Sequence, residues 1–178
     1  MLLDGHDPQL VPAMSDYHWY ALKVRARNES TVSTLLQRKN YETFLPTFVE
    51  KRKYSDRSKE VDTPLYPGYV FCRFNALHRL PVLTTPAVEY IVTTGKNLTP
   101  VEEHELAAVR QVVDSGLPAY PWPYLKAGQR VRIEEGSLTG VEGILIREKG
   151  AERLVICVEL VQRSVAVELD RCTVRPIH

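Results

Sequence analysis

The chain has 178 residues, a length that suits one large domain or two small ones. Its net charge of +1 excludes a global field that would drive binding to nucleic acid or membranes. Three scattered cysteines without a C-x-x-C pair argue for reduced thiols in a cytoplasmic protein rather than a disulfide or zinc framework. No apolar run approaches transmembrane length, so we expect no membrane association.

Residues 1–16 lack a basic segment and a sustained apolar run, and we expect a flexible tail rather than a signal peptide. A strand is predicted at 19–24, and a helix follows from Asn28, as its N-cap, to about Asn40. The chain returns as a strand at 41–45.

Residues 47–50 are predicted to be extended, and 51–59 carry five Lys or Arg against one Asp. This basic segment has no apolar period and is predicted to form a hairpin tip or loop. Two interpretations stay open, a solvated charged loop and an arm that contacts phosphates.

The stretch 64–74, PLYPGYVFCRF, joins a stiff turn to a buried strand. Its two prolines fix φ, Gly68 allows the chain to turn, and the second half is rich in β-branched and aromatic residues. The tyrosines of the turn can be structural or can form a surface for a partner.

A short helix is predicted within 75–83, interrupted at Pro81, and a strand at 88–92. Thr99 as N-cap, Pro100 at the first helical position and Glu102 as the capping-box acid predict a helix that ends at Gly116. Residues 17–116 therefore form an α+β domain, with a mainly antiparallel sheet flanked by helices.

Residues 117–126 contain three prolines and are predicted to be a stiff linker. Five short strands follow within 127–178, centred on 131–133, 143–147, 154–160, 164–169 and 172–175. Glycines at the turns favour a small five-stranded β-barrel, the second domain.

Two sets of motifs resemble a known family. Residues 18–115 resemble the NusG N-terminal domain through Trp19-Tyr20, the Pro-Gly-Tyr at 67–69, and Thr-Thr-Pro-Ala-Val at 84–88. Residues 126–176 resemble a KOW domain, an SH3-like barrel, through GQRVRI at 128–133, EGSLTGVEG at 135–143, and the segment 165–170. The order of the two sets is the family's order.

The resemblance implies a transcription elongation factor that binds the clamp helices of RNA polymerase and promotes processive elongation and antitermination. The residues at the matching polymerase-binding positions are Tyr66, Tyr20, Leu65 and Tyr69. Contact with the single-stranded non-template DNA is implied for Thr84, Thr85, Arg25, His78 and Arg79. The alternative for this second set is an ordinary polar surface beside a short helix.

The KOW domain of the family recruits partners, which implies a small-subunit ribosomal protein or the terminator Rho. The candidate positions depart from the usual pattern and are Leu138, Val161, Arg163 and Arg171. These departures argue against Rho and resemble the specialised RfaH-like antiterminators. The β-branched run at 155–158 predicts a stable barrel rather than one that refolds into helices.

Other classes of function find less support in the sequence. The five histidines have no metal-ligand spacing, and no nucleophile elbow or phosphate-binding glycine loop occurs, so we expect no enzyme activity, metal or cofactor. A ribosome-associated RNA-binding KOW protein is the alternative function, but it would require a strongly basic chain. A purely structural interaction domain also stays open, and a monomer is expected.

Overall fold

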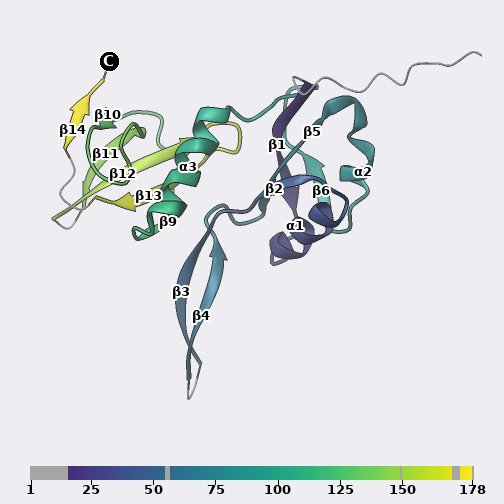
Figure 1. Cartoon of the computed structure of the whole chain (residues 1–178), viewed down its shortest axis with the longest axis horizontal. Helices are drawn as coiled ribbons and strands as arrows, with labels where there is room; N and C mark the ends of the chain where they lie inside the picture. Colours follow the sequence, from purple (N-terminus) through teal and green to yellow (C-terminus); the bar gives the residue numbers. More distant parts are fainter. Residues whose placement is uncertain (1–15, 55–56, 149, 170–172, 178) are drawn as a thin grey trace, which may run out of the picture.

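The structure, a computed structural model, describes residues 16–54, 57–148, 150–169 and 173–177. The tail expected at 1–16 therefore lies almost entirely outside the described residues. A four-stranded sheet with two helices forms one side of the molecule, and a six-stranded sheet forms the other (Figure 1). Helix α3 lies between them, and a two-stranded arm projects away from both. Across the described residues, no helix combines the length and the apolar character needed to cross a membrane.

The N-terminal sheet has the order β2-β5-β1-β6, and every pairing is antiparallel. Its strands are β1 (Tyr17–Val24), β2 (Glu42–Phe44), β5 (Tyr69–Asn75) and β6 (Val88–Ile91). Period-2 alternation along β1 divides its side chains between two apolar clusters. Tyr20 and Leu22 pack in the cluster that includes α1, whereas Trp19 and Ala21 pack in the cluster that includes α3.

Helix α1 (Glu29–Arg38) begins after Asn28, as expected, although the Asn28 side chain makes no capping bond. The segment after β5 is a 3₁₀ turn, η2 (Ala76–His78), followed by the single-turn helix α2 (Leu80–Leu83). Pro81 does not kink a longer helix. It lies in the first turn of α2, where a missing N–H costs no hydrogen bond.

Helix α3 (Glu103–Ser115) ends at Gly116 in the left-handed conformation, which confirms the predicted end. The predicted start at Thr99 is wrong, because Glu102 is extended and occupies the N-cap position. The Val101 amide donates to the Trp19 carbonyl at 2.8 Å. This bond fixes the residues before the helix against β1, so tertiary pairing overrides the local capping signal.

Two hairpins complete the N-terminal half. The arm is formed by β3 (Thr47–Tyr54) and β4 (Arg57–Pro64), so the segment predicted as a hairpin tip or loop belongs to a hairpin, with 51–54 and 57–59 in its paired strands. The smaller hairpin joins β7 (Thr93–Thr94) to β8 (Asn97–Leu98) through Gly95.

The C-terminal sheet has the order β14-β10-β11-β12-β13-β9. Its strands are β9 (Ala119–Trp122), β10 (Gln129–Ile133), β11 (Glu142–Glu148), β12 (Ala151–Val158), β13 (Arg163–Glu168) and β14 (Val174–Pro176). The five predicted strands are all present, in an arrangement consistent with an SH3-like barrel. The sixth, β9, comes from the stretch expected as a linker. It lies at the edge of the sheet, where Pro121 removes no interior ladder bond.

Candidate functional site

The turn between β4 and β5 is fixed at both ends by backbone hydrogen bonds. The Leu65 amide donates to the Pro46 carbonyl at 2.9 Å, and the Tyr69 amide donates to the Tyr66 carbonyl at 3.0 Å. Gly68 has φ +83°, its amide donates to Glu29 Oε1 at 2.8 Å, and this bond is buried. The turn is therefore held rigid both by its prolines, as predicted, and by hydrogen bonds to Pro46 and Glu29 elsewhere in the chain.

Tyr66 is 1% exposed, so the expectation that it forms part of an open surface is wrong for this arrangement. Its ring meets Phe71 edge to face, with centroids 5.6 Å apart. Its hydroxyl is buried and has no hydrogen-bond partner in the part of the chain that the structure describes. Burial raises the pKa of this hydroxyl, with smaller contributions from the nearby Cys157 and Glu105.

Helix α3 and the C-terminal sheet provide the cover over this face (Figure 1). The Glu105 carboxylate accepts a hydrogen bond from the Glu159 amide at 3.2 Å. The Gln111 amide nitrogen donates to the Ser137 and Thr139 carbonyls at 3.1 and 3.0 Å. Burial raises the pKa of the Glu105 carboxyl. Within the described residues, these three hydrogen bonds accompany an apolar contact, in which Leu106, Val109 and Val112 of α3 share one buried cluster with the C-terminal sheet.

The other predicted polymerase-binding residues do not share one face. Leu65 is buried in the same cluster as Tyr66, and Tyr69 is half-buried beside it, with Lys23 Nζ 4.8 Å from its ring centroid. Tyr20 lies on the opposite face of the sheet, where its ring is 4.6 Å from that of Phe74.

Two aromatic residues that the sequence did not indicate as docking positions lie on the Tyr66 face. Trp19 belongs to the same cluster, and Phe44 packs against it. The Arg110 guanidinium of α3 lies 4.9 Å from the Phe44 ring centroid and 5.8 Å from that of Trp19. The alternation of side chains along a strand could have indicated Trp19, because it places Trp19 and its neighbour Tyr20 on opposite faces of the sheet.

The predicted DNA-contact residues do not all lie at one end of the N-terminal sheet. His78 and Arg79 follow β5, whose last residue, Asn75, pairs with Tyr17 at the start of β1, whereas Arg25 follows Val24 at the end of β1. Arg25 follows β1, and its amide donates to the Ala87 carbonyl at 2.9 Å, next to the Thr-Thr pair. Arg25, His78, Arg79 and Thr84 are all exposed.

Thr85 differs from the other four because it is buried. Its hydroxyl donates to the Pro81 carbonyl at 3.0 Å and lies 2.8 Å from Lys39 Nζ. These bonds engage the hydroxyl within the fold, so Thr84 is the member of the pair that solvent and partners can reach.

The predicted partner-binding positions of the C-terminal sheet are divided between core and surface. Leu138 and Val161 are buried, Arg163 is exposed at the start of β13, and Arg171 lies outside the described residues. A groove of about 770 Å³ is lined by residues of α3 and of β10–β12. Within the described ranges, no three His, Cys, Asp or Glu side chains gather in a way that could hold a metal ion.

A family model described as "Transcription termination factor nusG" matches residues 17–110, more than half of the chain. The chain belongs to the NusG family. The matched region includes the turn, the arm, the loop that carries Thr84 and Thr85 and part of α3, and the resemblance noted for the N-terminal half is confirmed.

Relatives in the NusG family align over nearly the whole chain. "Transcription termination/antitermination protein NusG" of Lactococcus lactis subsp. lactis (strain IL1403) is 28% identical over 178 residues, covering 92% of this chain and 95% of the relative. The protein of the same name from Helicobacter pylori (strain ATCC 700392 / 26695) is 23% identical, covering 89% and 98%. The structure titled "Domain interaction in Thermotoga maritima NusG" has a TM-score of 0.54 at 20% identity, covers 92% of this chain and 99% of that one, and supports the fold.

Proposed function

We propose that this chain is a transcription elongation factor that binds the clamp helices of RNA polymerase through the Tyr66 face and promotes processive elongation and antitermination. The observation that carries the proposal is a family match that includes a rigid aromatic turn. An aromatic side chain held in one conformation loses little entropy when it binds, which suits a binding hot spot.

The buried hydroxyl of Tyr66 supports the same assignment. A buried polar group without a partner costs about 1–3 kcal/mol, so the covered arrangement leaves an interaction unmade. Polymerase binding at Tyr66 would require α3 and the C-terminal sheet to move, because they cover the ring. Among the described residues, the hydrogen bonds from α3 to the C-terminal half come from Glu105 and Gln111, and the apolar contacts of the shared cluster are the interactions that such a movement would break.

The non-template DNA strand is proposed to contact exposed residues around α2 and at the end of β1. Arg25, His78 and Arg79 supply cationic or polar groups, and Thr84 supplies a hydroxyl. Thr85 is proposed to position this loop through Lys39.

The C-terminal sheet is proposed to recruit a partner, a small-subunit ribosomal protein rather than Rho, and the chain is proposed to be a specialised RfaH-like paralog. Leu138 lies in the turn whose flanking carbonyls accept from Gln111, so separation from α3 would also free that turn. The proposed factor is a cytoplasmic monomer without enzyme activity or cofactor.

The test is binding of the full chain to a polymerase clamp-helix fragment. Tyr66→Ala is expected to weaken binding about thirtyfold, the effect of a hot spot worth about 2 kcal/mol. Tyr90→Ala is the control, because Tyr90 is an aromatic residue that is 52% exposed on β6. Gln111→Ala removes two bonds of the cover and is expected to strengthen binding.

Wild type and Gln111→Ala both failing to bind would contradict the proposed function. Binding that survives Tyr66→Ala but not Tyr90→Ala would leave the function standing and refute the assigned face.

A further inference from the structure

Cys157 is a free, half-buried thiol on β12, at the contact between α3 and the C-terminal sheet. It lines the groove of about 770 Å³ together with Glu105 and Gln111 of α3. Pockets that hold drug-sized molecules span about 300–1,000 Å³, so the groove is large enough to admit a small reagent. Solvent molecules can therefore reach this thiol through the groove, whereas Cys72 is fully buried in the N-terminal sheet.

The Cys157 thiol is held by β13 and by the segment that joins β9 to β10. Its sulfur accepts a hydrogen bond from Ser164 Oγ at 2.9 Å, and the thiol donates to the Leu125 carbonyl at 3.5 Å. A second sulfur bonded at about 2.0 Å from the first needs space that these partners occupy. Modification of Cys157 therefore costs at least one of the two contacts.

The buried hydroxyl of Tyr66 lies beside this thiol. The Tyr66 side chain is 1% exposed, and its hydroxyl has no hydrogen-bond partner among the described residues. Burial raises the pKa of the hydroxyl most, and the nearby Cys157 and Glu105 raise it further. These three groups form a polar cluster inside an otherwise apolar contact. Such a cluster is a weak point of the cover, because a buried polar group without a partner costs about 1–3 kcal/mol.

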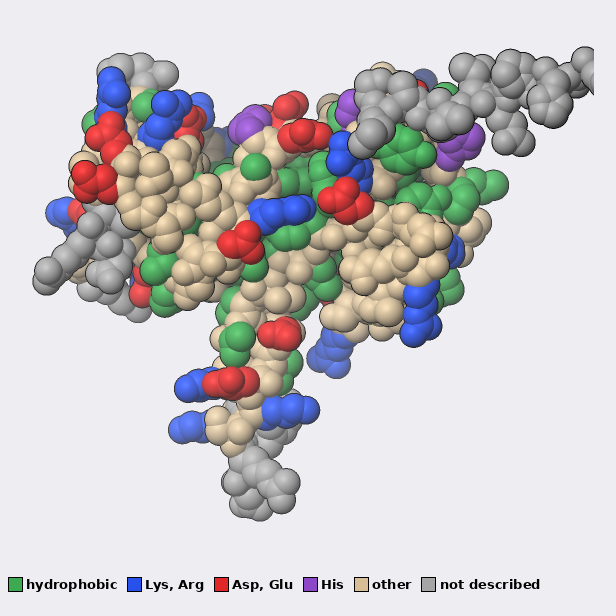
Figure 2. Space-filling model, viewed as in Figure 1, with side chains coloured by type: hydrophobic (Ala, Val, Ile, Leu, Met, Phe, Trp, Pro, Cys, Tyr) green, Lys and Arg blue, Asp and Glu red, His purple; other side chains and the backbone are tan. Residues whose placement is uncertain are grey.

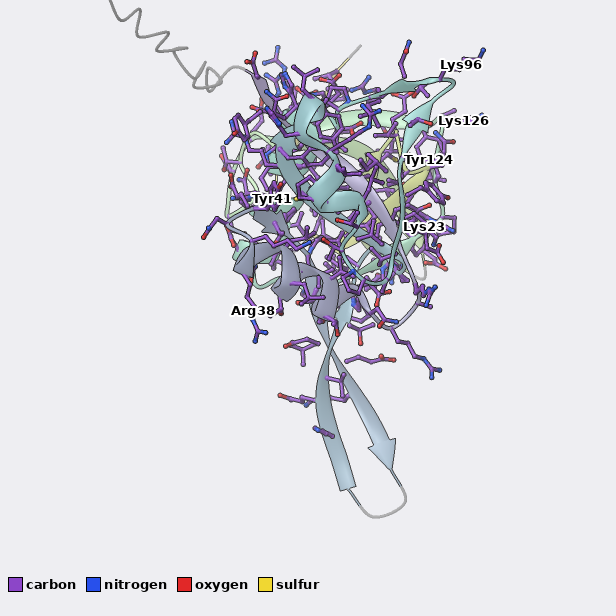
Figure 3. All side chains as sticks on the ribbon, turned by 90° about the vertical axis from the view of Figure 1, so that its right-hand side faces the viewer. Lys23, Arg38, Tyr41, Lys96, Tyr124 and Lys126 are labelled. Carbon is purple, nitrogen blue, oxygen red and sulfur yellow. The ribbon has the colours of Figure 1, made fainter. Side chains whose placement is uncertain are left out.

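The groove carries charged side chains of both signs. Its titratable lining residues, other than Cys157 and Tyr124, are His104, Glu105, Lys126, Arg130, Glu142 and Glu159. Figure 2 shows acidic and basic side chains (red and blue) close together over α3, with no broad patch of one sign there. Figure 3 places Tyr124 and Lys126 at the end of the molecule away from the arm, and Lys126 is exposed. A mixed lining of this kind suits a small molecule that carries both carboxylates and an ammonium group.

We propose that Cys157 is a thiolation site for a small peptide disulfide of the glutathione class, and that the adduct opens the cover over Tyr66. The Cys157 thiolate attacks one sulfur of the disulfide, and a new S–S bond forms as the old one breaks. The released thiolate takes up the proton that Cys157 lost, so Cys157 is oxidised and half of the disulfide is reduced to a thiol.

The direction of the effect follows from the charge of the adduct. While the cover is in place, the carboxylates of the adduct lie close to Glu105 and to the apolar cluster that α3 shares with the C-terminal sheet. Charges taken out of water at such a contact are costly, and a charged modification disrupts an apolar interface. Separation returns these charges to water, so the adduct favours the open arrangement.

The experiment treats the full chain carrying Trp122→Phe and Cys172→Ser with an excess of glutathione disulfide. Trp19 is then the only tryptophan, and it lies 6% exposed in the same cluster as Tyr66, so its quenching by acrylamide reports on the cover. The adduct is expected to raise the quenching constant severalfold and to leave the far-UV circular dichroism spectrum unchanged. Dithiothreitol is expected to reverse the rise, and peptide mass spectrometry checks that the adduct is on Cys157.

The matched control moves the same adduct to the exposed surface of α1, by adding Cys157→Ser and Ser30→Cys to the same background. Its Trp19 quenching is expected to stay at the value of the untreated chain. Failure of Cys157 to form the adduct would overturn the proposal, as would an adduct that leaves the quenching unchanged or raises it equally in the control. Loss of the circular dichroism spectrum would also overturn it, because the adduct would then unfold the chain rather than open it.

The consequence for polymerase rests on the proposed function, and binding to the clamp-helix fragment tests it separately. The adduct is expected to strengthen this binding about tenfold, because the apparent affinity is lowered by the fraction of molecules whose site is covered. Opening at Trp19 without binding of the fragment to either form would contradict the proposed function and support the site at Cys157. Binding of the fragment without opening by the adduct would support the function and overturn the site.

Discussion

Replacing Tyr66 by Phe removes one oxygen atom from a fully buried position in the turn between β4 and β5. The ring is 1% exposed and keeps its edge-to-face contact with Phe71, so the variant retains the packing. The hydroxyl has no hydrogen-bond partner among the described residues. An unpartnered buried hydroxyl costs about 1–3 kcal/mol, so Tyr66→Phe is expected to raise the free energy of unfolding by at least about 1 kcal/mol at pH 7.

Tyr120→Phe is the matched control, because this tyrosine has a partner. Its hydroxyl donates to Glu168 Oε1 at 3.2 Å, and its loss is expected to lower the free energy of unfolding by about 0.5–1.5 kcal/mol. Urea denaturation followed by circular dichroism measures both variants, with equal m values as the check on two-state behaviour. A loss of stability in Tyr66→Phe as large as that in Tyr120→Phe would refute the reasoning.

The same substitution has a pH dependence whose sign follows from the raised pKa of the Tyr66 hydroxyl. A tyrosine in the unfolded chain loses its proton near pH 10, while the buried hydroxyl keeps it. Above pH 10 the unfolded state therefore binds fewer protons than the folded state, and the free energy of unfolding falls by up to about 1.4 kcal/mol per pH unit. The stability difference between Tyr66→Phe and wild type is expected to stay constant from pH 7 to 9 and to widen by about that amount at pH 11. A difference that stays constant up to pH 11 would show that the hydroxyl is accessible.

Two further predictions concern the turn and the sheet beneath it. Gly68→Ala is expected to lower the free energy of unfolding by about 1 kcal/mol, because φ is +83° and a side chain is strained there, while the Lys23 Nζ that a Cβ would approach within 2.4 Å is the flexible end of a side chain that can move aside. Gly95→Ala shares the positive φ and is expected to cost about the same; a loss in thermal denaturation that is several kcal/mol larger for Gly68→Ala would refute the reasoning. Burial raises the pKa of the Cys72 thiol to about 12, so alkylation at pH 8.5 is expected to modify half-buried Cys157 at least a hundredfold faster. Peptide mass spectrometry measures the two rates, and similar rates in the folded protein would contradict the burial of Cys72.

The strands were predictable from the sequence because their signals are local. Alternation and β-branched runs indicated β1, β5 and the five strands at 129–176, and the left-handed Gly116 marked the end of α3. The start of α3 was not predictable from its capping signal, since the Val101 amide bonds to β1 instead. A capping pattern confined to a few neighbouring residues is overridden here by a hydrogen bond to a strand that is distant in the sequence.

The site was predictable in its residues but not in its exposure. Sequence motifs indicated Tyr66 and the Thr-Thr pair, but they contain no information about what packs over them. The cover over Tyr66 depends on α3 and on β12, which lie some forty to ninety residues further along the chain. Tyr20 was grouped with Tyr66 by the family pattern, although alternation along β1 places it on the other face.

The conflict between the predicted and observed exposure of Tyr66 has a physical consequence. A core position that is only structural would be filled at lower cost by phenylalanine, because the hydroxyl is buried at a penalty and has no partner among the residues that the structure describes. The penalty is recovered only in an arrangement where the hydroxyl reaches water or another acceptor. Such an arrangement requires α3 and the C-terminal sheet to leave the face, and the apolar contacts of the shared buried cluster oppose this step, whereas the bonds of Glu105 and Gln111 join α3 to the C-terminal half. The buried hydroxyl destabilises the covered state and therefore favours its opening. This effect explains why tyrosine rather than phenylalanine occupies the position, which packing alone does not explain.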